Sequence, residues 1–131
     1  MVIAGVVLDI VVRHARAEAP AECCGLLIGS AGHIVDAVRS SNLSADPHRY
    51  LIDPEAHFSA RRAARARGLS VVGFYHSHPH SAAAPSATDA AEATYPDHLY
   101  LIVGLGGGEA DARLFRFDQR NFVPIEFVTE S

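Results

Sequence analysis

Residues 70–79 have the sequence SVVGFYHSHP, an apolar run that ends in two histidines separated by one serine. The run Ser70–Tyr75 predicts a central β-strand, followed by a loop. Side chains two residues apart on a strand point to the same face, so the imidazoles of His76 and His78 are expected side by side. Two imidazoles on one face can share a metal ion.

A third candidate ligand follows in residues 85–89, which have the sequence PSATD. A short helix is expected from Ser86 to about Thr94, and the preceding loop can return Asp89 to the two histidines. Three nitrogen and oxygen ligands leave a tetrahedral zinc ion one open position, which is typical of a catalytic site. The sequence therefore predicts a catalytic zinc site.

Ser86 and Asp89 also fit a simpler interpretation as a helix N-terminus, in which Ser86 is the cap and Asp89 stands three residues further on. Capping does not account for the His-Ser-His triplet. The two interpretations are compatible, because a helix end is a rigid place for a metal ligand.

Glu22 begins the segment ECCGLLI, residues 22–28, which otherwise predicts a buried strand. A carboxylate at the mouth of a buried strand costs free energy unless it is paired or used. Taken alone, Glu22 is by default an edge residue that points to solvent. The nearby metal motif makes it the candidate general base.

The remaining pattern predicts one α/β domain, residues 1–131, with a mixed β-sheet flanked by helices. Val2–Val7 fits either a strand or the approach to a helix. Asp53 and Pro54 mark a helix start, and Gly68 follows its expected end. The expected elements include two helices, over 9–19 and over 54–67, and a hairpin of 22–28 with 33–39. Strands are expected over 98–103, 110–117 and 122–128.

Composition narrows the function classes. The chain has 131 residues, 49 % of them hydrophobic, and a net charge of −4, which gives no support to nucleic-acid binding. No apolar run is long enough to cross a bilayer. The adjacent Cys23 and Cys24 are poor candidates for a disulfide framework, so a cytoplasmic protein with reduced thiols is expected.

These motifs together resemble the JAMM (MPN+) zinc metallopeptidases. The family pattern is a glutamate, His-x-His, seven intervening residues and Ser-x-x-Asp, and residues 79–85 supply those seven. The resemblance implies a cytidine-deaminase-like architecture in which His76, His78 and Asp89 hold Zn²⁺. It further implies that a zinc-activated water is the nucleophile, that Glu22 moves its proton and that Ser86 hydrogen-bonds the oxyanion.

The same resemblance implies weaker roles for neighbouring residues. Ser77 matches a small hydroxyl position and is expected to support the backbone. Cys24 matches a family cysteine, and both cysteines are expected to be packing residues rather than nucleophiles. His80 is expected to be an exposed loop residue, although contact with substrate stays open.

The family resemblance also narrows the substrate. Only eight residues separate Asp89 from the strand expected at His98, so the chain resembles the short prokaryotic members. These are associated with ubiquitin-like and sulfur-carrier proteins, so an amide or isopeptide bond after a C-terminal Gly-Gly tail is the expected target. The alternatives are a non-catalytic MPN scaffold and, with less support, a RadC-like protein associated with DNA repair. The scissile bond and the oligomeric state stay open.

Overall fold

The computed structural model describes the backbone of residues 1–131 and all side chains except those of residues 91 and 92. The elements are, in chain order, β1 (Val2–Ala4), α1 (Gly5–Glu18), β2 (Cys24–Ser30), β3 (His33–Ser40), α2 (Pro54–Ala66), β4 (Ser70–His78), α3 (Ala87–Glu92), β5 (Leu99–Gly104), β6 (Asp111–Phe117), β7 (Phe122–Ile125) and β8 (Val128–Glu130).

The strands form one sheet in the order β7-β6-β5-β4-β2-β3-β1-β8. Neighbours are antiparallel except at β4–β5, β1–β3 and β1–β8, which are parallel. The parallel step from β4 to β5 needs a crossover, and α3 lies in that connection. The mixed sheet expected from the sequence is thus confirmed.

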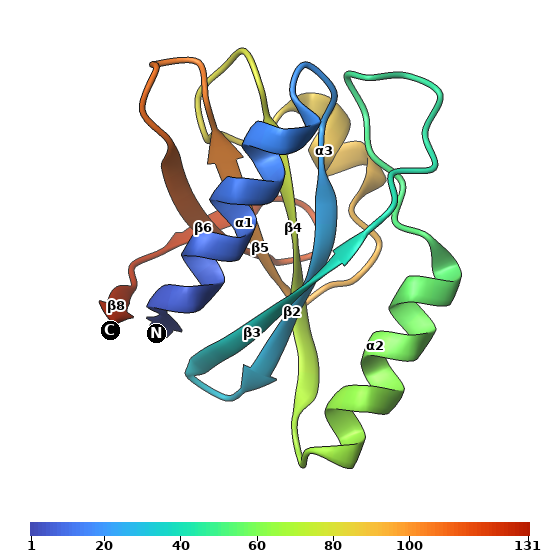
Figure 1. The fold of residues 1–131 in the computed structure, drawn as a ribbon, viewed down its shortest axis with the longest axis vertical. Helices are drawn as coiled ribbons and strands as arrows, with labels where there is room; N and C mark the ends of the chain where they lie inside the picture. The colour runs from blue at the N-terminus through green and yellow to red at the C-terminus, as the bar shows by residue number, and fades with distance from the viewer.

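The two long helices cover opposite faces of the central strands (Figure 1). Val7, Val11 and Ala15 of α1 belong to a buried cluster that also contains Leu27 and Tyr75 from the sheet. Ala60 and Ala64 of α2 belong to a second cluster with Leu26, Phe74 and Tyr100. Successive residues of β2 and β4 therefore contribute alternately to two cores.

This alternation decides where the polar end of β4 points. Phe74 packs on the α2 side and Tyr75 on the α1 side, so His76 and His78 share the α2 side with Phe74. Gly25, the partner of Tyr75 across the sheet, has no room for a Cβ beside the Tyr75 ring. A glycine there lets the ring lie flat and lets its hydroxyl reach Nδ1 of buried His14 at 2.7 Å.

Helix α2 begins and ends as the sequence predicts. The Asp53 carboxylate accepts a hydrogen bond from the backbone N–H of Glu55, and Pro54 occupies the first helical position. Gly68, just past the end, has a φ of 73°, which is in the left-handed region that favours glycine.

Two expectations are wrong in detail. The predicted strand over 122–128 is two strands, because β7 pairs with β6 whereas β8 pairs with β1 at the far edge of the sheet. The helix predicted from Asp9 begins at Gly5, directly after β1, so both interpretations of Val2–Val7 hold in part. The parallel pairing of β8 with β1 separates β8 from β7, and no pattern within residues 122–128 indicates it.

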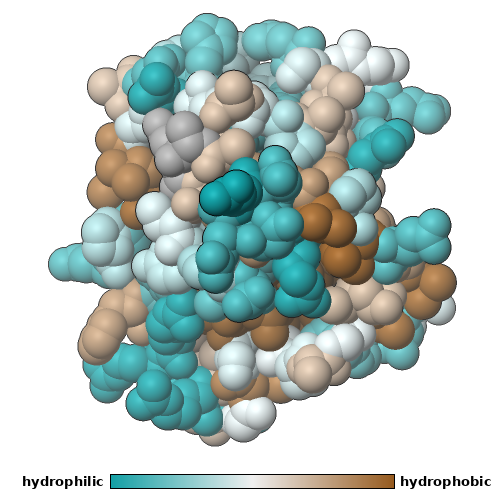
Figure 2. All heavy atoms as spheres, turned by 180° about the vertical axis from the view of Figure 1, so that it is seen from behind, coloured by the Kyte–Doolittle hydropathy of each residue, from teal (hydrophilic) through white to brown (hydrophobic). Residues whose placement is uncertain are grey.

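The surface mixes polar and apolar side chains. On the face opposite to that of Figure 1, polar groups gather in the middle between two apolar areas (Figure 2). Among the helices of the described residues, none has both the length and the apolar character that a membrane crossing requires.

Candidate metal centre

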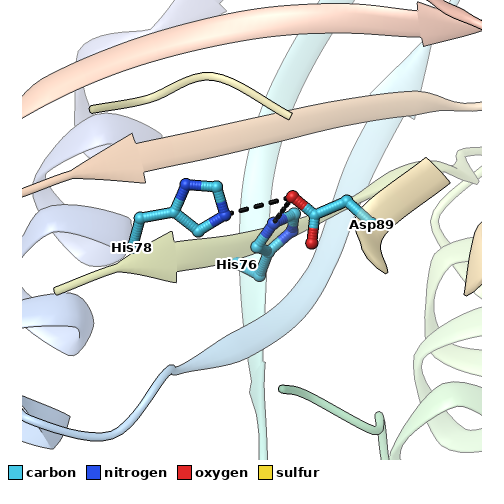
Figure 3. Close-up of side chains that lie close together, drawn as sticks. All are labelled: His76, His78 and Asp89. Carbon is cyan, nitrogen blue, oxygen red and sulfur yellow. Dashed lines mark hydrogen bonds and ion pairs between the residues drawn. The ribbon is translucent and has the colours of Figure 1, made fainter. Parts of the chain in front are cut away.

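Three side chains that the sequence singled out meet at the end of β4 (Figure 3). Oδ2 of Asp89 lies 3.2 Å from Nε2 of His76 and 3.1 Å from Nε2 of His78. One ligand atom from each residue lies within 4.8 Å of the others, and all three residues are buried. The predicted convergence of two imidazoles and one carboxylate is therefore present.

His78 is oriented by a hydrogen bond from its second ring nitrogen. Its Nδ1 lies 3.0 Å from the backbone oxygen of Ala82, which can only accept, so Nδ1 carries the proton. In the neutral ring this leaves the lone pair of Nε2 directed at Asp89. Metal-binding histidines are commonly held in this way.

His76 is held differently. It is fully buried, and among the described residues its Nδ1 has no hydrogen-bond partner. The ring of Tyr50 instead stacks on the imidazole, with 4.3 Å between the ring centroids and 17° between the planes.

Asp89 is fixed by the start of α3. Its Oδ2 accepts a hydrogen bond from the backbone N–H of Ser86, and the Ser86 hydroxyl accepts one from the backbone N–H of Asp89. This is the capping box expected from the sequence. Asp89 is both the third helical residue of this capping box and a candidate metal ligand, so the simpler interpretation and the functional one are both compatible with the geometry.

The pKa values reflect how strongly these groups are coupled. Burial lowers the pKa of His76, although Asp89 opposes the shift. Burial also acts to lower the pKa of His78, but Asp89, the Ala82 carbonyl and the charge of Glu22 together raise it. Burial acts to raise the pKa of Asp89, yet contacts with the two histidines hold it well below its usual range. Asp89 is therefore an anion, as a metal ligand must be.

The donor set fits a divalent transition metal. Two imidazole nitrogens and one carboxylate oxygen suit zinc, and they leave a position for a further ligand. Of the three residues, His76 gives the strongest argument for a bound metal. Its buried imidazole has no hydrogen bond at Nδ1, so the cost of burying this polar ring has to be offset by another interaction. The residues present thus fit the group that the sequence implies.

The sheet register accounts for the position of Glu22. Cys24 pairs with His76 across the antiparallel β2–β4 ladder. Ser77 continues it, because its N–H donates to the Cys23 carbonyl at 3.2 Å and its hydroxyl accepts from the Cys23 N–H at 2.9 Å. Continued by one residue, this register leads from the Cys23–Ser77 contact to Glu22 and His78. Glu22 is buried, and its charge contributes to the raised pKa of His78.

The weaker expectations agree with the structure. Ser77 supports the backbone, as predicted. Burial raises the pKa of Cys23 to about 11 and that of Cys24 to about 12, so both thiols stay protonated near neutral pH and neither is an activated nucleophile. His80 is exposed.

Sequence reasoning missed Asn42 and Tyr50, which lie in the loop between β3 and α2. The positions of Asn42 and Tyr50 in the sequence do not link them to the metal motif, because these residues come near it only when the chain folds. Tyr50 also lines a cavity of about 600 Å³ that Phe74, Tyr95 and Tyr100 share. The candidate metal centre therefore lies next to an aromatic cavity.

A family model described as prokaryotic homologs of the JAB domain matches residues 5–118. The chain belongs to this family. The prokaryotic JAB domain accounts for both the fold and the motif spacing noted above. The chain is 42 % identical over 106 residues to the desampylase of Haloferax volcanii, covering 76 % of each chain.

A further relative and a solved structure support the same family and fold. The chain is 33 % identical over 105 residues to the CysO-cysteine peptidase of Mycobacterium tuberculosis, covering 79 % of this chain and 72 % of the relative. A crystal structure of a JAB1/MPN domain protein from Archaeoglobus fulgidus superposes with a TM-score of 0.71 at 21 % identity and full coverage of both chains. That likeness shows the JAB1/MPN fold.

Proposed function

We propose that this protein is a zinc-dependent peptidase that hydrolyses the amide bond after the C-terminal Gly-Gly tail of a ubiquitin-like or sulfur-carrier protein. The observation that carries the proposal is the convergence of one possible ligand atom from each of His76, His78 and Asp89 within 4.8 Å. The relatives named desampylase and CysO-cysteine peptidase support the same reaction class.

The zinc ligands in this proposal are His76, His78 and Asp89. When bound there, zinc supplies Lewis-acid chemistry that polarises the scissile carbonyl and activates a water molecule near neutral pH. Asp89 contributes the single negative charge among the ligands. The Ala82 carbonyl keeps the Nδ1 proton on His78, so that Nε2 faces the metal position.

Glu22 is the proposed general base. Its carboxylate accepts the proton of the attacking water and then gives it to the departing amine, so the same group serves both steps. The burial of Glu22 suits this role, because a carboxylate shielded from bulk water exchanges its proton with the reacting atoms rather than with solvent.

Ser86 is the proposed oxyanion donor. Its hydroxyl oxygen already accepts from the Asp89 N–H, which leaves the hydroxyl proton free to be donated. A donor at the N-terminus of α3 also lies where the helix dipole favours negative charge. Both properties favour stabilisation of the tetrahedral oxyanion.

The substrate class follows from the relatives and from the compact chain. The name CysO-cysteine peptidase describes cleavage of a CysO–cysteine conjugate, and we extend that class of substrate to this protein. The two buried, free cysteines fit a reducing compartment, so we place the protein in the cytoplasm.

The test uses the purified protein loaded with one equivalent of Zn²⁺ and a ubiquitin-like carrier that ends in Gly-Gly. The carrier is joined by a peptide bond to cysteine in one assay and by an isopeptide bond to a lysine of a second protein in the other. Mass spectrometry is expected to show the free Gly-Gly carboxylate in at least one assay. Wild-type protein without metal, and His76→Ala with zinc, should release none.

Two results would overturn the proposal. Absence of stoichiometric zinc in the wild-type protein would favour the non-catalytic scaffold. Zinc binding without cleavage of either bond, alongside an active control peptidase, would reject this substrate class.

A further inference from the structure

The two candidate histidine ligands differ in what holds their rings. Nδ1 of His78 donates to a backbone carbonyl, whereas Nδ1 of His76 has no hydrogen-bond partner among the described residues. A metal-binding imidazole usually relies on such a second contact to set its rotation about the Cβ–Cγ bond. Something else must therefore orient His76.

Tyr50 lies against one face of the His76 ring. The two rings are nearly parallel, 17° apart, with 4.3 Å between their centroids. A ring that rests flat on an imidazole restricts its rotation without using either nitrogen. Burial, followed by the nearby charges of Tyr100 and Asp89, raises the pKa of the Tyr50 phenol, so this neighbour is neutral.

Asn42 holds Tyr50 through the residues on either side of it. Its Nδ2 donates to the backbone oxygen of Arg49 at 2.9 Å, and its Oδ1 accepts from the backbone N–H of Leu51 at 2.9 Å. The same Nδ2 donates to the backbone oxygen of Glu22 at 3.1 Å. One side-chain amide thus links the backbone of the candidate base to the backbone that carries the stacked ring.

We propose that Tyr50 is a positioning residue for His76 and that Asn42 fixes Tyr50 in this role. The inference rests on the proposed metal site. Tyr50 acts through the imidazole rather than on the substrate: its ring keeps Nε2 of His76 directed at the position that Asp89 and His78 also face. Loss of the ring weakens metal binding even though all three ligands remain.

The test is the affinity of the full-length protein for Zn²⁺, measured by competition with a chromophoric chelator. Tyr50→Ala is expected to weaken zinc binding by about 10- to 100-fold, the range typical of residues that orient a metal-binding histidine. Tyr50→Phe keeps the ring and is expected to stay within about threefold of wild type. In the Co²⁺-loaded protein, the visible absorption bands should change in Tyr50→Ala and persist in Tyr50→Phe.

Tyr95→Ala is the matched control. Tyr95 lines the same cavity, but its ring contacts are with His57, Phe74 and His98 rather than with His76. Removing it enlarges the cavity to a similar extent and should leave zinc affinity unchanged. If Tyr50→Ala does not fold, as judged by circular dichroism, Tyr50→Leu replaces it, because leucine fills the space without a stacking face.

Asn42→Ala is expected to weaken zinc binding by a smaller factor than Tyr50→Ala, and the double variant should be no weaker than Tyr50→Ala alone. Equal zinc affinity in Tyr50→Ala and wild type would overturn this inference and leave the proposed function standing. An equal loss in Tyr50→Phe and Tyr50→Ala would also overturn it, because the hydroxyl rather than the ring would then matter. Failure of the wild type to bind zinc would overturn both.

Discussion

Two parts of the molecule face the candidate metal centre, and they are held in opposite ways. The segment 76–89 is organised by contacts between residues three or four apart, namely His78 with the Ala82 carbonyl and Ser86 with Asp89. The loop 41–53 also has contacts of its own, such as Asn42 with the Arg49 carbonyl, but contacts across the fold join it to the site: Asn42 with the Glu22 carbonyl and Tyr50 with His76.

The difference separates the candidate metal ligands from the groups around them. Short-range contacts form whenever the local sequence adopts its turn and helix, so part of the geometry of the segment 76–89 is local. The base and the stacked ring arrive only when β2 pairs with β4 and the loop closes. Substitution of a candidate ligand in the first part should therefore abolish metal binding, whereas substitutions in the second should alter catalysis or weaken metal binding without abolishing it.

The largest effect is expected from Asp89→Ala. It removes the single charged ligand, whose Oδ2 contacts both imidazoles. Metal analysis after dialysis should find less than about a tenth of the wild-type zinc, since loss of a ligand exceeds the 10- to 100-fold effect of an outer residue. Asp111→Ala, at an exposed acid paired with Arg113, should retain full zinc. Full occupancy in Asp89→Ala would remove Asp89 from the ligand set.

Glu22→Gln should separate catalysis from metal binding. The amide is close in size to the carboxylate but cannot accept the water's proton, so kcat is expected to fall by about 10²- to 10⁴-fold. Zinc content should stay at the wild-type level, and Glu126→Gln on the exposed surface should change neither quantity. A kcat within threefold of wild type would assign the base to another group.

Ser86→Ala tests a residue with two expected roles. Loss of the cap should lower the free energy of unfolding by about 1 kcal/mol. Loss of the oxyanion donor should lower kcat by about 10²-fold with little change in KM. Asp53→Ala removes the cap of α2 and should show the stability loss alone. Matching kcat values for the two variants would limit Ser86 to capping.

Ser77→Ala should have the smallest effect on activity, although it cuts the link between the two parts. The buried N–H of Cys23 loses its acceptor, which is expected to cost about 1–3 kcal/mol of unfolding free energy in urea titrations. The decrease in kcat should stay below that of Ser86→Ala, because no reacting group is removed. Ser59→Ala, on an exposed position of α2, should leave both quantities unchanged. Unchanged stability in Ser77→Ala would show that the hydroxyl does not join the two strands.

The strand and helix pattern shows the same division. The hairpin β2–β3 and the caps of α2 and α3 were predictable, because turn and cap residues act within a few positions of each other. The break between β7 and β8 was not, because residues 122–128 form one apolar run with Glu126 as its one charged residue, and only the parallel pairing of β8 with β1 separates the two strands. Gly25 stands in the segment ECCGLLI, but the reason for a glycine at this position appeared only with the Tyr75 ring beside it.

By itself, the sequence determined that His76 and His78 share a face and that Asp89 sits in the first turn of a helix, because strand alternation and capping are local properties. Only the tertiary structure decided that the charge of Glu22 acts on His78 and that Tyr50 stacks on His76. Those positions depend on the β2–β4 register, on the hydrogen bond from Asn42 to the Glu22 carbonyl and on the stacking of Tyr50 on His76, and each of these joins residues far apart in the chain. Pairing across such distances depends on which surfaces are buried together, and one sequence does not specify that position by position.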